Sequence, residues 1–162
     1  MLARPITSSI TLLACALVLA QPLTRAAESH AHAPGAAASE LRLDEGRKWA
    51  TDLPLRRGMA EIRQVVSGAP AMAHAGTAYP TVYAALGKRV DAPVGRIVAE
   101  CKLEPKADAM LHLVIADLLA GADAMKAAKS GPEGREGLLK VAAALDAYGK
   151  YFDDAGYKPL GR

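Results

Sequence analysis

A methionine and a histidine are the side chains of this sequence that best suit soft metal coordination. Met59 and His112 each stand six positions after the residues, Leu53 and Lys106, at which we expect their helices to begin. The first and third helices of an up-down-up-down arrangement run the same way, so a rise of about 1.5 Å per residue brings both side chains to a similar height. A thioether and an imidazole at one level of a core suit haem iron or copper. The alternative is that Met59 fills a gap in the core and His112 is solvated.

His74 is a secondary metal candidate, because it follows Met72 by two positions. This spacing resembles that of copper-handling segments, but two residues so placed on a helix point to different faces. A shared role therefore requires the chain to be unwound after Pro70. The alternative is a histidine near a helix end, where the helix dipole favours it.

Cys101 is the other secondary candidate. It is the only cysteine that remains once a leader containing Cys15 is removed, so the exported chain has no intramolecular disulfide. Lys102 and Lys106 would lower the pKa of a nearby thiol, which suits copper binding or redox chemistry. The place of Cys101 on an apolar stripe predicts instead a buried and inert thiol.

A polar group surrounds the start of the first predicted helix, at Trp49, Asp52, Arg56 and Arg63. The two arginines are seven positions apart and therefore share one helix face. We take Trp49, Arg56 and Arg63 as the candidate binding surface, for an anion or for a protein partner. The alternative is a network of surface ion pairs.

Four apolar stripes at helical spacing predict an all-α protein. Short connections between them favour antiparallel neighbours, so residues 41–162 are predicted to form an antiparallel up-down-up-down four-helix bundle. The stripes are Leu55, Met59, Ile62, Val66, Ala69 and Ala73; Tyr79, Tyr83, Leu86, Val90, Val94, Ile97 and Cys101; Leu111, Ile115, Leu118, Ala122 and Met125; and Leu138, Val141, Leu145, Tyr148 and Phe152.

Caps and prolines mark where these helices begin and break. The first should start after an N-cap at Thr51 or Asp52, and Pro70 should kink or end it. Pro93 should kink the second helix or split it near Asp91.

The N-terminal residues predict export. Arg4 precedes the apolar run ITLLACALVLA, which is shorter than the roughly 20 residues of a membrane-spanning helix and is typical of a signal peptide. Cleavage fits after Ala20 or after Ala26, and we favour the second. Residues 1–26 then form the signal peptide and residues 27–40 a flexible tail. We expect a periplasmic or secreted mature protein without a membrane span.

Composition and motifs argue against nucleic acid and against the common enzyme classes. The chain has 20 Lys+Arg and 17 Asp+Glu, but Arg4 and Arg25 leave with the leader, so the mature net charge is +1. One Trp, one Phe and five Tyr offer little for stacking on bases. The sequence has no P-loop, GxGxxG, GxSxG, HExxH or CxxCH motif. We expect a protein that is not an enzyme and has no nucleic-acid partner.

A resemblance to one family is carried by three stretches, LRLDEGRKWATDLPLRRGMAEIR, CKLEPKADAMLHLVIADLLAGADAM and ALDAYGKYFD. These stretches resemble a family of small exported proteobacterial proteins, some of them labelled DnrO-like. The resemblance spans residues 41–160 and implies an exported helical protein. It brings little established function with it.

At the level of the fold, the chain also resembles soluble cytochrome b562, a family of periplasmic four-helix haem proteins. The likeness lies in LHLVIADLLAGADAM and LKVAAALDAYGKYF. That family binds haem through a methionine early in the first helix and a histidine late in the fourth. Met59 matches the first ligand, but Gly149 stands where the histidine is expected, so a haem would need His112 instead.

The sequence thus predicts a periplasmic, non-enzymatic four-helix bundle that binds copper or haem. Met59 and His112 are the predicted ligands, with His74 and Cys101 as secondary ones. The alternative is an envelope module without a cofactor, which binds a protein partner through the Trp49 region. A third hypothesis is an enzyme with Cys101 as a redox thiol.

Overall fold

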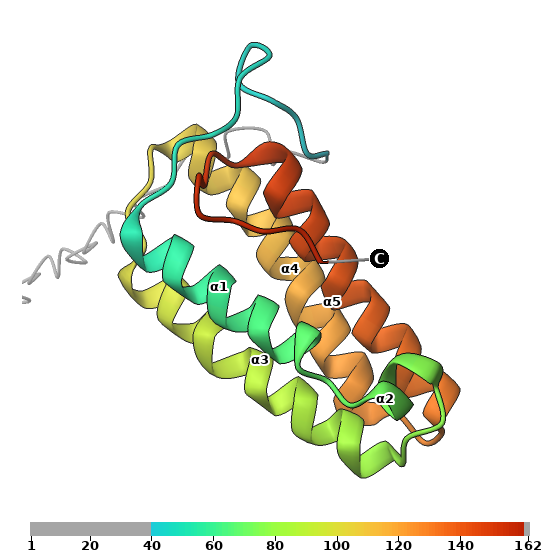
Figure 1. Cartoon of the computed structure of the whole chain (residues 1–162). Coiled ribbons are helices and arrows are strands. Elements are labelled where there is room, and N and C mark those ends of the chain that lie inside the picture. Colours follow the sequence, from blue (N-terminus) through green and yellow to red (C-terminus); the bar gives the residue numbers. More distant parts are fainter. Residues whose placement is uncertain (1–39, 161–162) are drawn as a thin grey trace, which may run out of the picture. The chain divides into compact units, whose positions relative to one another are not determined.

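The computed structural model describes residues 40–160, and this part of the chain is all-helical, as predicted. The predicted signal peptide, residues 1–26, and the predicted tail up to residue 39 lie outside the described residues. The helices are, in chain order, α1 (Leu53–Ser67), α2 (Ala71–Ala75), α3 (Pro80–Glu100), α4 (Pro105–Ala127) and α5 (Gly131–Tyr151) (Figure 1).

Prolines and side-chain caps fix where the long helices begin. α1, α3, α4 and α5 each carry a proline in their first two positions, where the missing N–H costs no hydrogen bond. Asp52 caps α1 by accepting a hydrogen bond from the backbone N–H of Leu55 at 2.9 Å. Ser130 caps α5 in the same way through the N–H of Glu133. Of the two predicted N-caps, Asp52 is therefore the correct one.

Pro70 ends the first predicted stretch, whereas Pro93 does not divide the second. α1 stops at Ser67, and Pro70 precedes the separate short helix α2. α3 is continuous through Pro93, so the expected alternative of a split near Asp91 is wrong. Pro93 is buried on the core side of α3, and the packing of that face offsets the hydrogen bond that proline cannot donate.

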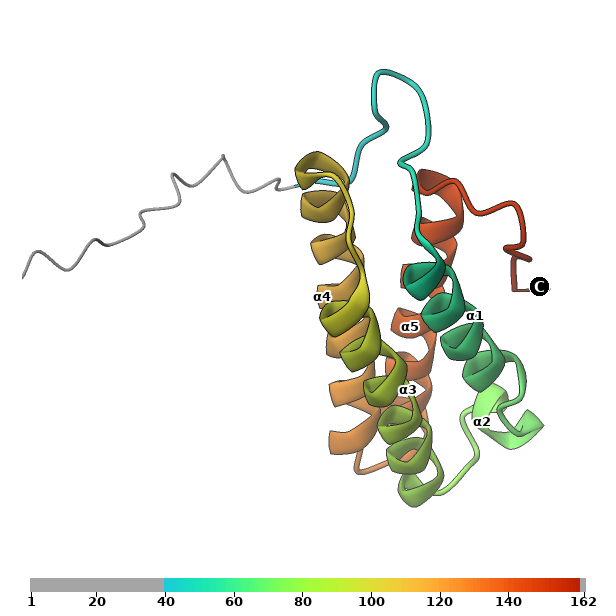
Figure 2. The same ribbon diagram turned by 90° about the vertical axis from the view of Figure 1, so that its left-hand side faces the viewer.

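The helices bury their apolar stripes against one another. α4 packs against α3 and α5, α1 packs against α3 and α5, and α2 lies on α5 (Figure 2). Every predicted stripe residue is buried except Tyr79, which is 77% exposed ahead of α3, and Cys101, which is half-buried at its end. Within residues 40–160 no polar or charged residue is buried in this core. None of the helices of that range is long and apolar enough to span a bilayer.

Helices α4 and α5 approach each other at paired glycines. A Cβ added to Gly137 of α5 would stand 2.7 Å from the backbone N of Met125 and 2.9 Å from the carbonyl O of Gly121, both in α4. Those distances leave no room for a side chain, so the two backbones lie in direct contact.

Backbone hydrogen bonds join the segment before α1 to the residues at the end of α5. The backbone N–H of Trp49 donates to the carbonyl of Tyr151, and that of Asp153 donates to the carbonyl of Trp49, each at 2.8 Å. The hydroxyl of Thr51 donates to the carbonyl of Asp153 at 2.6 Å. The C-terminal segment, residues 153–160, therefore leaves α5 next to the start of α1 (Figure 1).

Candidate functional site

Met59 and His112 do not meet in the structure. Met59 is fully buried in the core, whereas the side chain of His112 is 70% exposed on α4. The Nδ1 atom of His112 lies 2.9 Å from the carbonyl O of Asp108, one turn earlier on the same helix. Each residue of a helix rotates by about 100°, so one step past the buried Leu111 carries His112 out of the core. The expectation that the two side chains face each other is therefore wrong.

The surroundings of Gly149 do not fit a haem ligand either. This is the position at which the resemblance to cytochrome b562 places a histidine, and a Cβ there would collide with the ring of Tyr157. The Tyr157 hydroxyl donates to the carbonyl O of Leu145 at 2.7 Å, which holds the ring in place. Across residues 40–160 no three His, Cys, Asp or Glu side chains gather as a metal site requires. The pairing of Met59 with His112 that was predicted for haem therefore does not fit this arrangement.

His74 and Met72 lie on the surface of α2. The chain after Pro70 is helical, not unwound as a shared ligand role required. Both side chains are exposed, and their separation by two positions points them to different faces. The carbonyl of His74 accepts a hydrogen bond from Nε of Arg135 at 2.7 Å, which ties α2 to α5.

Cys101 faces a carboxylate and not a cation. Its thiol donates a hydrogen bond to Oδ1 of Asp52 at 3.4 Å, while Lys102 contributes its backbone N–H to Oδ2 of the same carboxylate at 2.7 Å. Burial, followed by the hydrogen bond and charge of Asp52 and the charge of Asp108, raises the pKa of the Cys101 thiol to about 12. This environment favours the inert thiol over the activated one.

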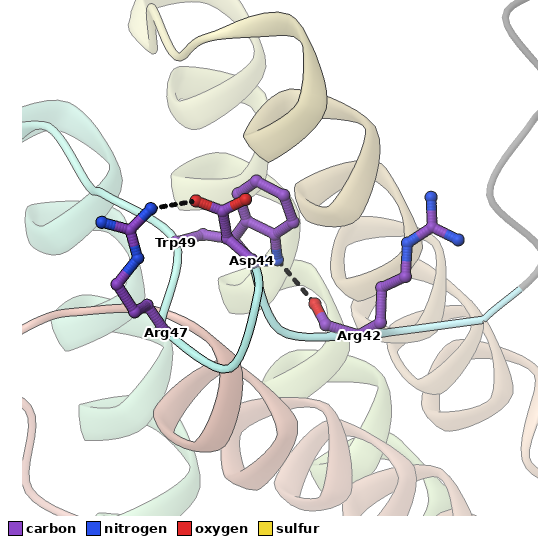
Figure 3. A network of polar contacts seen from close by, with 4 residues as sticks. All are labelled: Arg42, Asp44, Arg47 and Trp49. Atoms are coloured by element: carbon purple, nitrogen blue, oxygen red, sulfur yellow. Dashed lines mark hydrogen bonds and ion pairs between the residues drawn. The ribbon is translucent and has the colours of Figure 1, made fainter.

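Trp49 belongs to the core and is not an exposed binding residue. It is only 8% exposed, and its Nε1–H donates to the carbonyl O of Arg42 at 2.6 Å (Figure 3). Two residues earlier, Arg47 forms an ion pair with Asp44 at 3.3 Å, which closes the turn that leads to Trp49. The predicted binding surface therefore loses Trp49 and keeps the two arginines.

Arg56 and Arg63 both bind backbone carbonyls. Nη1 of Arg56 donates to the carbonyl and the hydroxyl of Thr51, at 2.7 and 3.1 Å. Arg63 donates from Nε to the carbonyl of Lys158 and from Nη2 to that of Pro159, the latter at 3.4 Å. Neither arginine takes part in the ion pairs of the described chain, so the predicted alternative of an ion-pair network is wrong. Because their hydrogen-bond acceptors are neutral, both guanidinium groups keep a positive charge that can attract an anion.

Together with the C-terminal segment, these arginines line a recess of about 640 Å³, which we call the arginine recess. A volume of this size lies within the range of roughly 300 to 1,000 Å³ that is usual for small-molecule sites. Residues 153–158 form one wall. The other wall is one face of α1, whose members follow the helical spacing i, i+1, i+4, i+7 and i+8: Arg56, Arg57, Ala60, Arg63 and Gln64.

Hydrogen bonds hold the C-terminal wall in place. The carboxylate of Asp154 accepts one from the hydroxyl of Tyr148 at 2.9 Å and one from the backbone N–H of Gly156 at 3.0 Å. Burial, and then the bond to Asp154, raises the pKa of Tyr148, and burial raises the pKa of Tyr157 to about 12. Both phenols are thus protonated at neutral pH, and the wall of the recess is preorganised and independent of their titration.

Charge in the arginine recess is predominantly positive. Three guanidinium groups and the ammonium of Lys158 face two carboxylates, those of Asp153 and Asp154. Both oxygens of Asp154 already accept hydrogen bonds. The N–H groups of the arginines that make no hydrogen bond within the protein suit a carboxylate or phosphate group, which arginine binds through paired N–H groups.

Sequence reasoning found two residues of this recess and missed the others. Arg57 and Gln64 repeat the seven-residue spacing of Arg56 and Arg63 one position later, and this signal was available in the sequence. No spacing in the sequence points to Lys158. It lies next to Arg63 only because the C-terminal segment runs back along α1.

No protein-family model, curated protein or solved structure matches the chain. Its function is therefore argued from its own residues and their geometry.

Proposed function

We propose that this chain is a periplasmic, non-enzymatic protein that binds an anionic ligand in the arginine recess. The observation that carries the proposal is the single face of α1 on which three guanidinium groups border one cavity. Hydrogen bonds from guanidinium to carboxylate or phosphate are about twice as strong as neutral ones. The predicted signal peptide of residues 1–26 supports export of the protein.

We further propose that the four long helices form an antiparallel up-down-up-down bundle, with α2 inside the first connection. The support comes from the contacts between consecutive long helices and between α1 and α5. The predicted resemblance of residues 41–160 to the exported DnrO-like family, and of the helices to cytochrome b562, would favour the same arrangement. A rigid helix would hold Arg56 and Arg63 at a fixed separation on one side of the bundle.

Binding of simple anions by the purified protein tests the proposal. Titration calorimetry with inorganic phosphate, succinate and citrate should detect saturable binding that weakens with added salt. Arg57 lines the recess and is exposed, so Arg57→Gln should leave the fold intact. We expect this variant to bind about fivefold more weakly, the effect of one exposed charged contact worth about 1 kcal/mol.

The matched control is Arg89→Gln, which removes the same charge from an exposed position of α3 away from the recess. It should bind as the wild type does. Equal losses in the two variants would mean that anions respond only to net charge, and the proposal would then be abandoned. The same holds if none of the three anions binds.

Copper or haem binding is a second candidate with weaker support. The observation closest to it is that Cys101, Asp108 and His112 line one small recess of about 50 Å³ between α3 and α4. The raised pKa of Cys101 disfavours the thiolate that a metal would bind. Titration with Cu(I) would support this candidate only if Cys101→Ser and His112→Ala each abolished stoichiometric binding.

A protein partner in the envelope is the remaining alternative. Such a partner would engage the same arginines if it presented acidic side chains to the recess. In that case Arg57→Gln would weaken the capture of the partner and small anions would not bind.

A further inference from the structure

The arginine recess has a cationic group at each of its two ends. Arg56 and Arg57 lie at the end where Thr51 binds Arg56 and Asp153. Arg63 lies seven residues further along α1, which corresponds to about 10 Å of helix axis. There its side chain donates to the backbone carbonyl of Lys158, so Arg63 and Lys158 are neighbours at that end, and both line the recess.

Small uncharged residues separate these two ends. Ala60 stands midway between Arg56 and Arg63 on the same face of α1 and is exposed. Gly156, on the opposite wall, adds no side chain to the recess. The centre therefore leaves space for an uncharged chain, while the ends attract acidic groups.

The balance of charge points to two negative groups on the ligand. Four cationic side chains and two carboxylates line the recess, which leaves a net charge of +2. The backbone of Asp153 is bonded to Thr51 at the Arg56 end, where two arginines stand against this one acidic residue. A ligand with two acidic groups would neutralise the recess, whereas one with a single acidic group would leave a charge unpaired.

We infer that the ligand of the arginine recess is an elongated dianion, of the class of α,ω-dicarboxylates, that spans from Arg56 and Arg57 to Lys158. This inference rests on the proposed function, because it specifies the ligand of the same site. One carboxylate binds the guanidinium groups of Arg56 and Arg57. The other binds the ammonium of Lys158, with the amide of Gln64 as a neighbouring donor. The connecting chain lies over Ala60.

A chain-length series tests this inference. The purified protein is titrated with α,ω-dicarboxylates of increasing length and with the monocarboxylate of each length, at constant ionic strength. Affinity for the diacids should pass through a maximum, at which the diacid binds at least tenfold more tightly than its monoacid. Lys158→Gln should remove this advantage, so that each diacid binds about as tightly as its own monoacid. Because Arg63 binds the backbone carbonyl of Lys158, this variant keeps the contact that holds the segment.

The possible outcomes separate the inference from the proposed function. If diacids of every length bind no better than monoacids, while Arg57→Gln still weakens both, the recess binds anions and the dianion inference is wrong. If an amino acid with one carboxylate binds more tightly than any diacid, the ligand is a zwitterion and the inference is again wrong. If no carboxylate of either series binds, the dianion inference is wrong, and the proposed function fails as well only if inorganic phosphate does not bind either. Arg89→Gln serves as the control throughout.

Discussion

The carboxylate of Asp52, at the N-terminus of α1, accepts a hydrogen bond from the thiol of Cys101, at the C-terminal end of α3, at 3.4 Å. The same carboxylate accepts hydrogen bonds from the backbone N–H groups of Leu55 and Lys102, at 2.9 and 2.7 Å. One side chain thus caps α1 and binds the end of α3, which joins two helices that pack against each other.

The contacts of Asp52 should make the stability of the protein depend on pH in the acid range. Burial would raise the pKa of Asp52, but the hydrogen bonds from Lys102, Leu55 and Cys101 together hold it below its ordinary value of 3.8. A carboxyl whose pKa is lowered in the folded state stabilises the protein above its ordinary pKa, and this contribution is lost as the pH falls through the folded value. Asp52→Asn should cost about 1 kcal/mol at neutral pH, and the difference from the wild type should close below about pH 4.

Urea unfolding of both proteins at a series of pH values measures this difference. Asp153→Asn, at an exposed carboxylate, is the control and should follow the wild type across the range. A constant gap between Asp52→Asn and the wild type down to the lowest pH would refute the role assigned to the charge of Asp52.

The thiol of Cys101 should react slowly while the protein is folded. Its pKa of about 12, against an ordinary value of 9.0, lowers the thiolate fraction at pH 8 on the order of a thousandfold. Alkylation by iodoacetamide, followed by mass spectrometry, should therefore be slow in the native protein and fast in urea. Asp52→Asn removes the neighbouring negative charge and should accelerate the native reaction. A native rate close to that in urea would restore the hypothesis of a reactive thiol.

Substitutions of Met59 and His112 should affect stability very differently. Met59→Ala removes a fully buried side chain and should cost about 2 to 5 kcal/mol in the free energy of unfolding, while Met59→Leu should cost less than about 1.5 kcal/mol. His112→Ala, at an exposed position, should change it by no more than about 0.5 kcal/mol. If the two were joint ligands, Met59→Leu and His112→Ala would abolish metal or haem binding to the same extent. We expect neither to alter absorption spectra recorded with haem or copper.

A pair of glycine substitutions checks the close approach of α4 and α5. Gly137→Ala places a methyl group against the backbone of α4 and should destabilise the protein by about 1 to 3 kcal/mol. Gly95→Ala, on the exposed face of α3, meets no atom within 4 Å and should stabilise it by about 0.5 to 1 kcal/mol. Thermal or urea unfolding of the two variants gives the comparison. Similar changes in both would argue against the helix contact seen here.

The positions of the long helices could be predicted from the sequence, because the signals that begin and end a helix are local. Asp52 caps α1 by accepting a hydrogen bond from the backbone N–H three positions later. Pro80 and Pro105 stand in the first turns of α3 and α4, and Pro70 separates α1 from α2. The apolar stripes could also be predicted from residue spacing, since a period of 3.6 residues follows from helix geometry alone. Nearly all of their members are buried.

Which polar residues meet could not be predicted in this way, because it depends on the packing of distant parts of the chain. His112 lies one step beyond a buried stripe, and the packing of α4 against its neighbours turns it outward. Trp49 is buried because its backbone pairs with residues on both sides of Phe152. Lys158 reaches Arg63 across 95 positions of sequence, through a segment without regular secondary structure. Such contacts depend on how distant parts of the chain pack, and residue spacing carries no information about them.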